Sequence, residues 1–177
     1  MTHQPAPRSL LLYCATTAAA FSALAMTTAA AVLATGSSED ARRLLGFDFG
    51  GVNRSLGEAI TIAVHNTALA GGVLACATAL PRLSRRLAVD VLLATILTLN
   101  AAAIGIAIGA YGANAIAALA PHAPLELAAF SLAGGAYMQA RKQAITARSL
   151  TLIGATCAVL LAAGAFLETS VRLGGSR

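Results

Sequence analysis

Two side chains that could do chemistry lie four residues apart in the segment Pro121-His122-Ala123-Pro124-Leu125-Glu126. This spacing would place the His122 imidazole and the Glu126 carboxylate on one side of the start of a helix. Three uses of the pair are open. It could be a structural hydrogen bond that caps the helix, a proton-handling pair tuned by burial, or part of a metal site joined by His65 and another carboxylate.

Other polar side chains interrupt long apolar segments of the sequence. Counted from the ends of those segments, most of them fall in the same half of a membrane. Because a central carboxylate costs about 2.5–3.5 kcal/mol in hydrocarbon, we expect these groups to face one another or water inside a bundle. The expected polar cavity comprises His65, Asn66, Asn100, His122, Glu126 and Glu168. Alternatively, Asn66 and Asn100 form simple hydrogen bonds between helices, and Glu168 lies among lipid headgroups.

No enzyme motif accompanies these residues. The sequence has no His-Glu-x-x-His metal-binding pattern, no Gly-x-Ser-x-Gly nucleophile pattern and no Walker phosphate-binding pattern. Cys14, Cys76 and Cys157 each lie inside an apolar segment, without the spacing of a disulfide framework or a zinc site. We therefore expect a protein without enzymatic activity, without a cofactor and without a bound metal.

The elements that must position the polar residues are membrane-spanning helices. Of the 177 residues, 58% are hydrophobic and only 11% are charged, whereas about 25% of a soluble domain is charged. Crossing a hydrocarbon core of about 30 Å takes about 20 apolar residues, so the length allows about five helices and no separate soluble domain. The net charge of +5 comes from basic residues between apolar segments, which indicates topology and not nucleic-acid binding.

The sequence predicts an all-α, polytopic transmembrane helix bundle of about five spans. It divides into an N-terminal anchor helix (1–36), an extracytoplasmic loop (37–58) and a four-helix membrane core (59–177). The expected apolar segments are residues 9–36, 59–80, 91–120, 124–140 and 149–167. The third is longer than a bilayer requires, so we expect a tilt, a kink or an interfacial extension near Gly112 and Pro121. The first is expected to be a retained anchor, with a cleaved leader as the alternative.

Lysine and arginine residues predict the orientation of the chain. The short connections near residues 81–86 and 141–148 are strongly basic, whereas the 37–58 loop mixes three arginines with four acidic residues. Short basic loops stay in the cytoplasm. We therefore expect a multi-pass protein of the cell membrane with a cytoplasmic N-terminus, an extracytoplasmic C-terminus and the polar cavity in the outer half.

Small residues predict close packing of the helices. The spacing Ala101-x-x-x-Gly105-x-x-x-Gly109 places three small residues on one side of a helix, where another backbone can approach closely. Gly134-Gly135 and Gly71-Gly72 offer further small surfaces. Their partner helices could belong to the same chain or to a second copy, so a homodimer is an open alternative. The other expected partners are the lipid bilayer and other membrane proteins.

The polar and small residues occur in an order that resembles the stage II sporulation protein M family of integral membrane proteins, also described as a domain of unknown function. The resemblance runs from the second apolar segment to the C-terminus. The features that carry it are His65-Asn66, Asn100-Ala101, the segment 121–126, Gly134-Gly135 and Leu167-Glu168. Ala101 and Ala123 stand where the family has glycine, and His65 stands where it has asparagine.

The resemblance implies a polytopic protein without established catalytic activity. In spore formers it implies a membrane scaffold for a cell-wall-remodelling complex, and in other bacteria it implies relatives encoded near transport and peptide-maturation systems. We therefore expect a scaffold or assembly factor for a membrane or cell-wall-associated complex. The alternative is a transporter or export-system subunit whose outer-half cavity binds a proton, a cation or a small substrate. A third interpretation is an intramembrane metal enzyme.

Overall fold

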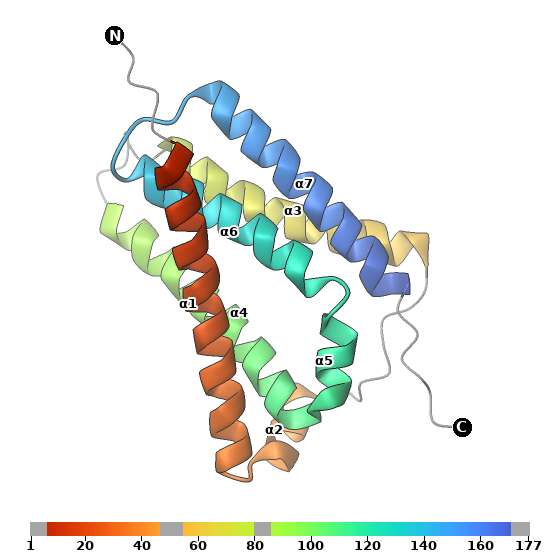
Figure 1. Cartoon of the computed structure of the whole chain (residues 1–177). Helices are drawn as coiled ribbons and strands as arrows, with labels where there is room; N and C mark the ends of the chain where they lie inside the picture. Colours follow the sequence, from red (N-terminus) through yellow and green to blue (C-terminus); the bar gives the residue numbers. More distant parts are fainter. Residues whose placement is uncertain (1–6, 47–54, 80–85, 171–177) are drawn as a thin grey trace.

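A computed structural model shows the arrangement of the helices (Figure 1). It describes residues 7–46, 55–79 and 86–170, and within these ranges it contains helices and no strand. The helices are α1 (Pro7–Ala34), α2 (Ser38–Leu45), α3 (Leu56–Ala79), α4 (Arg86–Tyr111), α5 (Ala113–Leu119), α6 (Ala123–Ala140) and α7 (Ala147–Ser170). The predicted all-α class is confirmed.

Four of these helices, α1, α3, α4 and α7, are long and apolar enough to cross a membrane. The helices α5 and α6 pass the same test only as a pair, and they meet at an angle of 65°. The described residues therefore provide four spans, or five if the bent pair counts as one span. The chain is a multi-pass membrane protein, in agreement with the sequence.

The long third apolar segment is broken at Gly112. Its φ of 57° and ψ of −128° define a backbone conformation that other residues adopt only with strain. The chain turns back at this point, so that α5 leaves the end of α4 in a new direction (Figure 1). A second break follows, and Pro124 then occupies the first turn of α6, where its missing N–H is not needed. Of the tilt, kink or interfacial extension expected here, the structure shows a kink, as a sharp turn of the chain.

The helices pack as two groups that share α6 (Figure 1). In one group α1 lies along both α4 and α6, and in the other α3, α6 and α7 contact one another. The main core combines buried residues of α3, α6 and α7: Ala70, Leu74, Ala129, Ala133, Ala136, Ile153, Cys157 and Leu161. Many large apolar side chains face outward instead, as expected where the surrounding solvent is lipid.

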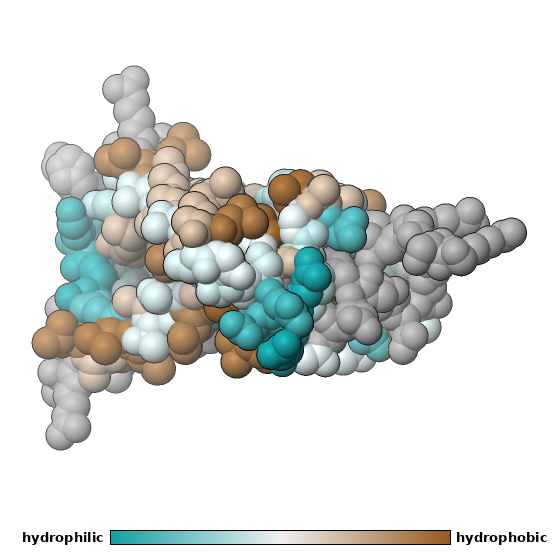
Figure 2. All heavy atoms as spheres, turned by 90° about the horizontal axis from the view of Figure 1, so that it is seen from below, coloured by the Kyte–Doolittle hydropathy of each residue, from teal (hydrophilic) through white to brown (hydrophobic). Residues whose placement is uncertain are grey.

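The expected 37–58 loop begins with the short helix α2, which caps the end of α4. Ser38 Oγ donates a hydrogen bond to the Gly109 carbonyl (3.0 Å), and Arg42 Nε donates one to the Ala110 carbonyl (2.8 Å). Carbonyls in the last turn of a helix lack partners within that helix. Seen from this end, hydrophilic side chains gather over α2 (Figure 2). The remainder of the loop, residues 47–54, lies outside the described residues.

The helix α2 was not expected from its sequence. Its eight residues include two acidic and two basic side chains, and so short a helix is marginal on its own. Contacts with α4, from far along the chain, supply the stabilisation that local sequence does not show. These include the Arg42 guanidinium, which lies 5.6 Å from the centre of the Tyr111 ring.

Candidate functional site

The first turn of α6 lies inside the bundle. A Cβ added to Gly164 of α7 would lie 3.7 Å from the His122 carbonyl oxygen and 3.3 Å from Cγ of Glu126. Gly164 precedes the end of α7 by about 9 Å, at 1.5 Å per residue. The start of α6 therefore lies about 9 Å farther into the bundle than the end of α7. Gly164 could not be recognised from the sequence, because a single glycine in an alanine-rich helix forms no distinctive spacing.

Asn66 and Glu126 meet at this position. Asn66 Nδ2 of α3 donates a hydrogen bond of 2.8 Å to Glu126 Oε1 of α6, and both residues are partly buried. A hydrogen bond to an ionised acceptor is stronger than one between neutral groups. Glu126 also lies in the first turn of its helix, where the helix dipole favours a negative charge. The hydrogen bond therefore links α3 to α6 inside the bundle.

Two further carboxylates extend from Glu126 toward the mouth of the bundle. Glu168, near the end of α7, lies within electrostatic range of Glu126. Glu58, in the first turn of α3, lies within electrostatic range of Glu168. In the described part of the chain none of the three forms an ion pair. This end of the α3–α6–α7 group is therefore a region of negative charge when the carboxyl groups are ionised.

His122 is buried beside this region without forming the expected side-chain pair. Its side chain is 6% exposed, and Nδ1 has no hydrogen-bond partner among the described residues. His122 occupies the N-cap position of α6 but makes no side-chain cap. The Glu126 backbone N–H donates to the His122 carbonyl (3.2 Å), while the Glu126 carboxylate is bonded to Asn66. The capping hydrogen bond that the sequence suggested is therefore not formed.

Two residues expected in the cavity face away from it. His65 is exposed on α3, because neighbouring residues of a helix point about 100° apart and Asn66 is the one that faces α6. Asn100 is exposed on α4, and its Nδ2 donates to the Ile96 carbonyl of its own helix (2.8 Å). The expectation of one cavity with six polar members is corrected at these two positions.

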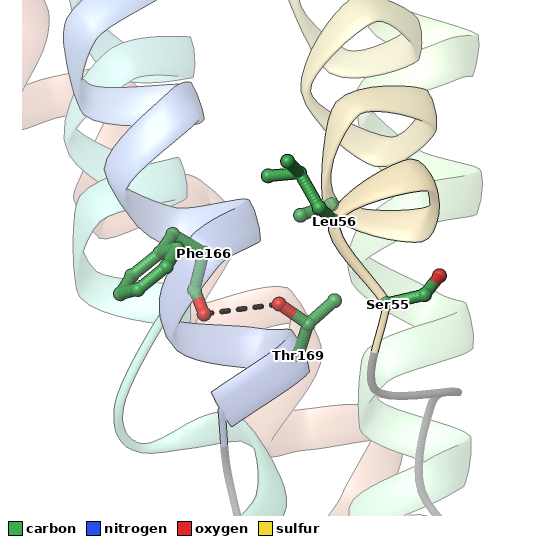
Figure 3. A pocket seen from close by; sticks show the side chains of 5 residues that line it. Ser55, Leu56, Phe166 and Thr169 are labelled. Atoms are coloured by element: carbon green, nitrogen blue, oxygen red, sulfur yellow. Dashed lines mark hydrogen bonds between the residues drawn. The ribbon is translucent and has the colours of Figure 1, made fainter.

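A shallow pocket of about 190 Å³ opens at the mouth between α3 and α7 (Figure 3). Its lining residues are Ser55, Leu56, Ala59, Phe166 and Thr169. The Thr169 hydroxyl already donates to the carbonyls of its own helix at Ala165 and Phe166, both at 3.1 Å. In the described ranges, no three His, Cys, Asp or Glu side chains are grouped so that they could hold a metal ion.

A second polar network joins α4 to the opposite end of α6. Asp90 accepts hydrogen bonds from Tyr137 Oη (2.5 Å) and Arg141 Nη2 (2.7 Å), the second of which is an ion pair. Tyr137 is 7% exposed. This network was not predicted from the sequence, where its signal is a single acidic residue, Asp90, near the start of an otherwise apolar helix. The helix α6 is therefore fixed by polar contacts at both ends.

The expected packing stripe on α4 lies against α1. Ala101 is fully buried and Gly105 and Gly109 are buried. A Cβ on Gly105 would clash with the Ala25 carbonyl oxygen and lie 2.7 Å from Thr28 Cβ of α1. Real Cβ atoms do not approach so closely, so the glycine permits this contact between the two backbones.

The glycine pair of α6 also faces α1. A Cβ on Gly134 would lie 3.0 Å from Thr17 Cγ2, and one on Gly135 would lie 2.6 Å from Cys14 Sγ. The small residues of α4 and α6 are therefore used within the chain. Gly71 and Gly72 of α3 differ, because both are exposed and no atom of the described residues lies within 4 Å of a Cβ added to either.

Comparison of this chain with known protein families, with curated proteins and with solved structures finds no match. The function is therefore argued from the chemistry and placement of its own residues, and the resemblance to the stage II sporulation protein M family stays a prediction.

Proposed function

We propose that this protein is a non-enzymatic scaffold or assembly subunit that holds other membrane proteins together in the cell membrane. The outward placement of His65 and Asn100 carries the proposal. His65 lies about 14 Å along α3, and Asn100 lies about 16 Å from the end of α4, so both are deep in their spans. Exposed polar groups at such depth are costly in lipid. Contacts with another protein would satisfy them.

Two polar cross-links between the helices also support a scaffold. Asn66 bonded to Glu126 joins α3 to one end of α6, and Asp90 bonded to Arg141 joins α4 to the other end. A platform that presents polar groups at fixed positions benefits from such cross-links, because a partner then binds without ordering the platform. The resemblance to the stage II sporulation protein M family favours the same function.

The proposed orientation places the α6–α7 connection in the cytoplasm and the C-terminus outside. Arg141, Lys142 and Arg148 lie in or next to this connection, and such short basic segments remain on the cytoplasmic side. In this orientation Glu58, Glu126 and Glu168 lie in the outer half of the membrane.

Site-specific photocrosslinking in intact cells tests the scaffold. A photoreactive amino acid at position 65 should form an adduct with another membrane protein. The matched control is position 27, which is exposed on α1 and whose threonine hydroxyl already donates to the Ala23 carbonyl (2.8 Å). Protein adducts at position 65 but not at position 27 would support the proposal. A membrane-inserted chain with no protein adduct at position 65 would exclude a partner on this face.

A transporter or export-system subunit is the second candidate, and the placement of Glu126 favours it. Its carboxylate lies at the start of a helix that begins inside the bundle, beside the carboxylate of Glu168. Broken helices of this kind form ion and substrate sites in transporters. The variant Glu126→Gln keeps an oxygen that can accept from Asn66, so it should fold and lose pH-dependent flux in proteoliposomes. Unchanged flux in the folded variant would rule out a proton-coupled role for this residue.

A further inference from the structure

We infer that Asn100 marks a homodimer interface in which α4 packs against α4 of a second copy of this chain. The inference rests on the proposed function, because it identifies one partner of the scaffold. It concerns a different surface from the one on which the sequence suggested a dimer. That stripe, Ala101 with Gly105 and Gly109, is covered by α1.

The face of α4 that carries Asn100 has no cover within the described chain at that level. Asn100 and Ala103 are exposed, and so are the flanking Leu99 (64%) and Ile96 (40%). One amide N–H of Asn100 is used by the Ile96 carbonyl. The second amide N–H and Oδ1 have no hydrogen-bond partner among the described residues. A donor and an acceptor are therefore presented together from the middle of a span.

A symmetric contact with a second copy would satisfy the Asn100 carboxamide. Two copies with the same orientation in a membrane are related by a two-fold axis along the membrane normal. Such an axis keeps every residue at its own depth, so Asn100 of one copy meets Asn100 of the other when α4 lies beside the axis. A carboxamide carries both donors and an acceptor, so the two side chains can each donate to the other. Ala103, one turn away, leaves room for the two backbones to approach.

His65 is less suited to the same symmetric contact. A neutral imidazole has its donor and its acceptor at different ring nitrogens, and a charged imidazole has donors only. We therefore assign the Asn100 face to a second copy and leave the His65 face of α3 for a different protein.

Disulfide trapping in proteoliposomes tests the interface. The variant Asn100→Cys should form a covalent dimer on mild oxidation. The wild type, with its three native cysteines, and Thr27→Cys on α1 should remain monomeric under the same conditions. A covalent dimer at position 100 alone supports the interface, whereas equal yields at positions 27 and 100 would show random collision and overturn it.

The strength of the interface is measured by counting photobleaching steps of labelled chains at increasing dilution in lipid. Asn100→Leu should weaken dimerisation by about tenfold, since the two hydrogen bonds that it removes between the copies together contribute about 1.4 kcal/mol. Asn100→Gln, which keeps a carboxamide, should recover part of the loss. Because the residue is exposed, both variants should unfold at the wild-type temperature in detergent. A dimer whose strength is the same in Asn100→Leu as in the wild type would overturn the inference.

Failure of the inference and failure of the scaffold give different results. A chain that is monomeric in lipid, yet forms adducts with another protein at position 65, excludes the dimer and leaves the scaffold. A dimer that forms through Asn100 without any adduct at position 65 supports the inference and excludes a partner on α3.

Discussion

Opposing effects act on the charge of the Glu126 carboxylate. Its carboxylate accepts a hydrogen bond from Asn66 and lies at a helix start, and both effects favour the charged form. Burial and the neighbouring carboxylate of Glu168 act against that charge. Removing the amide donor therefore leaves a partly buried acceptor without a partner, and such losses cost more than the net value of the bond.

We expect Asn66→Leu to lower the free energy of unfolding by about 1–3 kcal/mol. The adjacent variant His65→Leu, at an exposed position, should change it by less than about 0.5 kcal/mol in detergent. Unfolding in mixed micelles with increasing SDS measures both. In the double variant Asn66→Leu/Glu126→Leu the cost should be smaller than the sum of the two single costs. Strict additivity would show that the hydrogen bond does not contribute to stability.

The sequence identified the polar residues of this site but not the direction in which each points. The transmembrane helices are apolar on nearly every side, so their pattern does not tell which face is buried, as it does in an amphipathic helix. His65 and Asn66 were therefore equal candidates, although only Asn66 reaches α6. Glu58, which is not among the six residues of the predicted cavity, completes the row of carboxylates because the start of α3 lies beside the end of α7.

At the scale of elements, α1 and α6 hold the two groups of helices together. The glycines of α4 and α6 both face α1, so α1 contacts two helices through surfaces without side chains. Hydrocarbon provides no hydrophobic driving force between helices, and close packing is the main source of attraction. The stability of the α1–α4 pair should therefore depend on the absence of a Cβ at these positions.

We expect Gly105→Ala to destabilise the bundle by about 1–3 kcal/mol, because the added methyl group would push α4 away from α1. Gly72→Ala is the matched control. The same methyl group on α3 has open space around it, and it should leave stability unchanged or raise it. Thermal unfolding of the two variants in the same detergent makes the comparison. Equal effects would contradict the close contact between α1 and α4.

Gly112→Ala should be destabilising for a different reason. A Cβ at this position meets no atom within 4 Å in the described part of the chain. The positive φ of 57° nevertheless strains any residue that carries a Cβ. The cost should be about 1–3 kcal/mol. The decrease in thermal stability should be accompanied by faster hydrogen exchange in α5. A Gly112→Ala chain with wild-type stability would show that the turn between α4 and α5 relaxes at no cost.

The long apolar helices were predictable from composition and length. Glycine and proline in a segment too long for one span indicated a tilt, a kink or an extension there, without deciding among them. The existence of α2 and the identity of helix neighbours were not predictable. Both depend on contacts between distant parts of the chain, such as Arg42 with Ala110. Short connections limit how far apart consecutive helices can lie. They do not determine that α6 contacts α1, α3 and α7.

At the scale of the whole molecule, the bent α5–α6 pair decides on which side each connection lies. The helix α2 is bound to the end of α4 by Ser38 and Arg42, so these segments lie on one side of the membrane. If α5 and α6 together cross, the α6–α7 connection lies on the other side. If they form a re-entrant loop, it lies on the same side.

Single cysteines at Glu39 in α2 and at Gln143 in the α6–α7 connection distinguish these topologies. In intact cells we expect a membrane-impermeant maleimide to label Glu39→Cys, and to label Gln143→Cys only after the membrane is opened. The wild type controls for its three native cysteines. Opposite labelling would invert the proposed orientation, and labelling of both variants from one side would show that the bent pair does not cross.

The threonines of α1 have a consequence for how the chain is made. Thr16, Thr27 and Thr28 donate to carbonyls one turn earlier in the same helix, at 2.8–2.9 Å, so α1 needs no neighbour to satisfy these hydroxyl groups. A ribosome completes α1 well before the glycines of α4 that will contact it, since domains are synthesised from the N-terminus. The α1 helix can therefore be stable alone in lipid before α4 is synthesised. Packing of α1 against α4 begins only after α4 has been inserted.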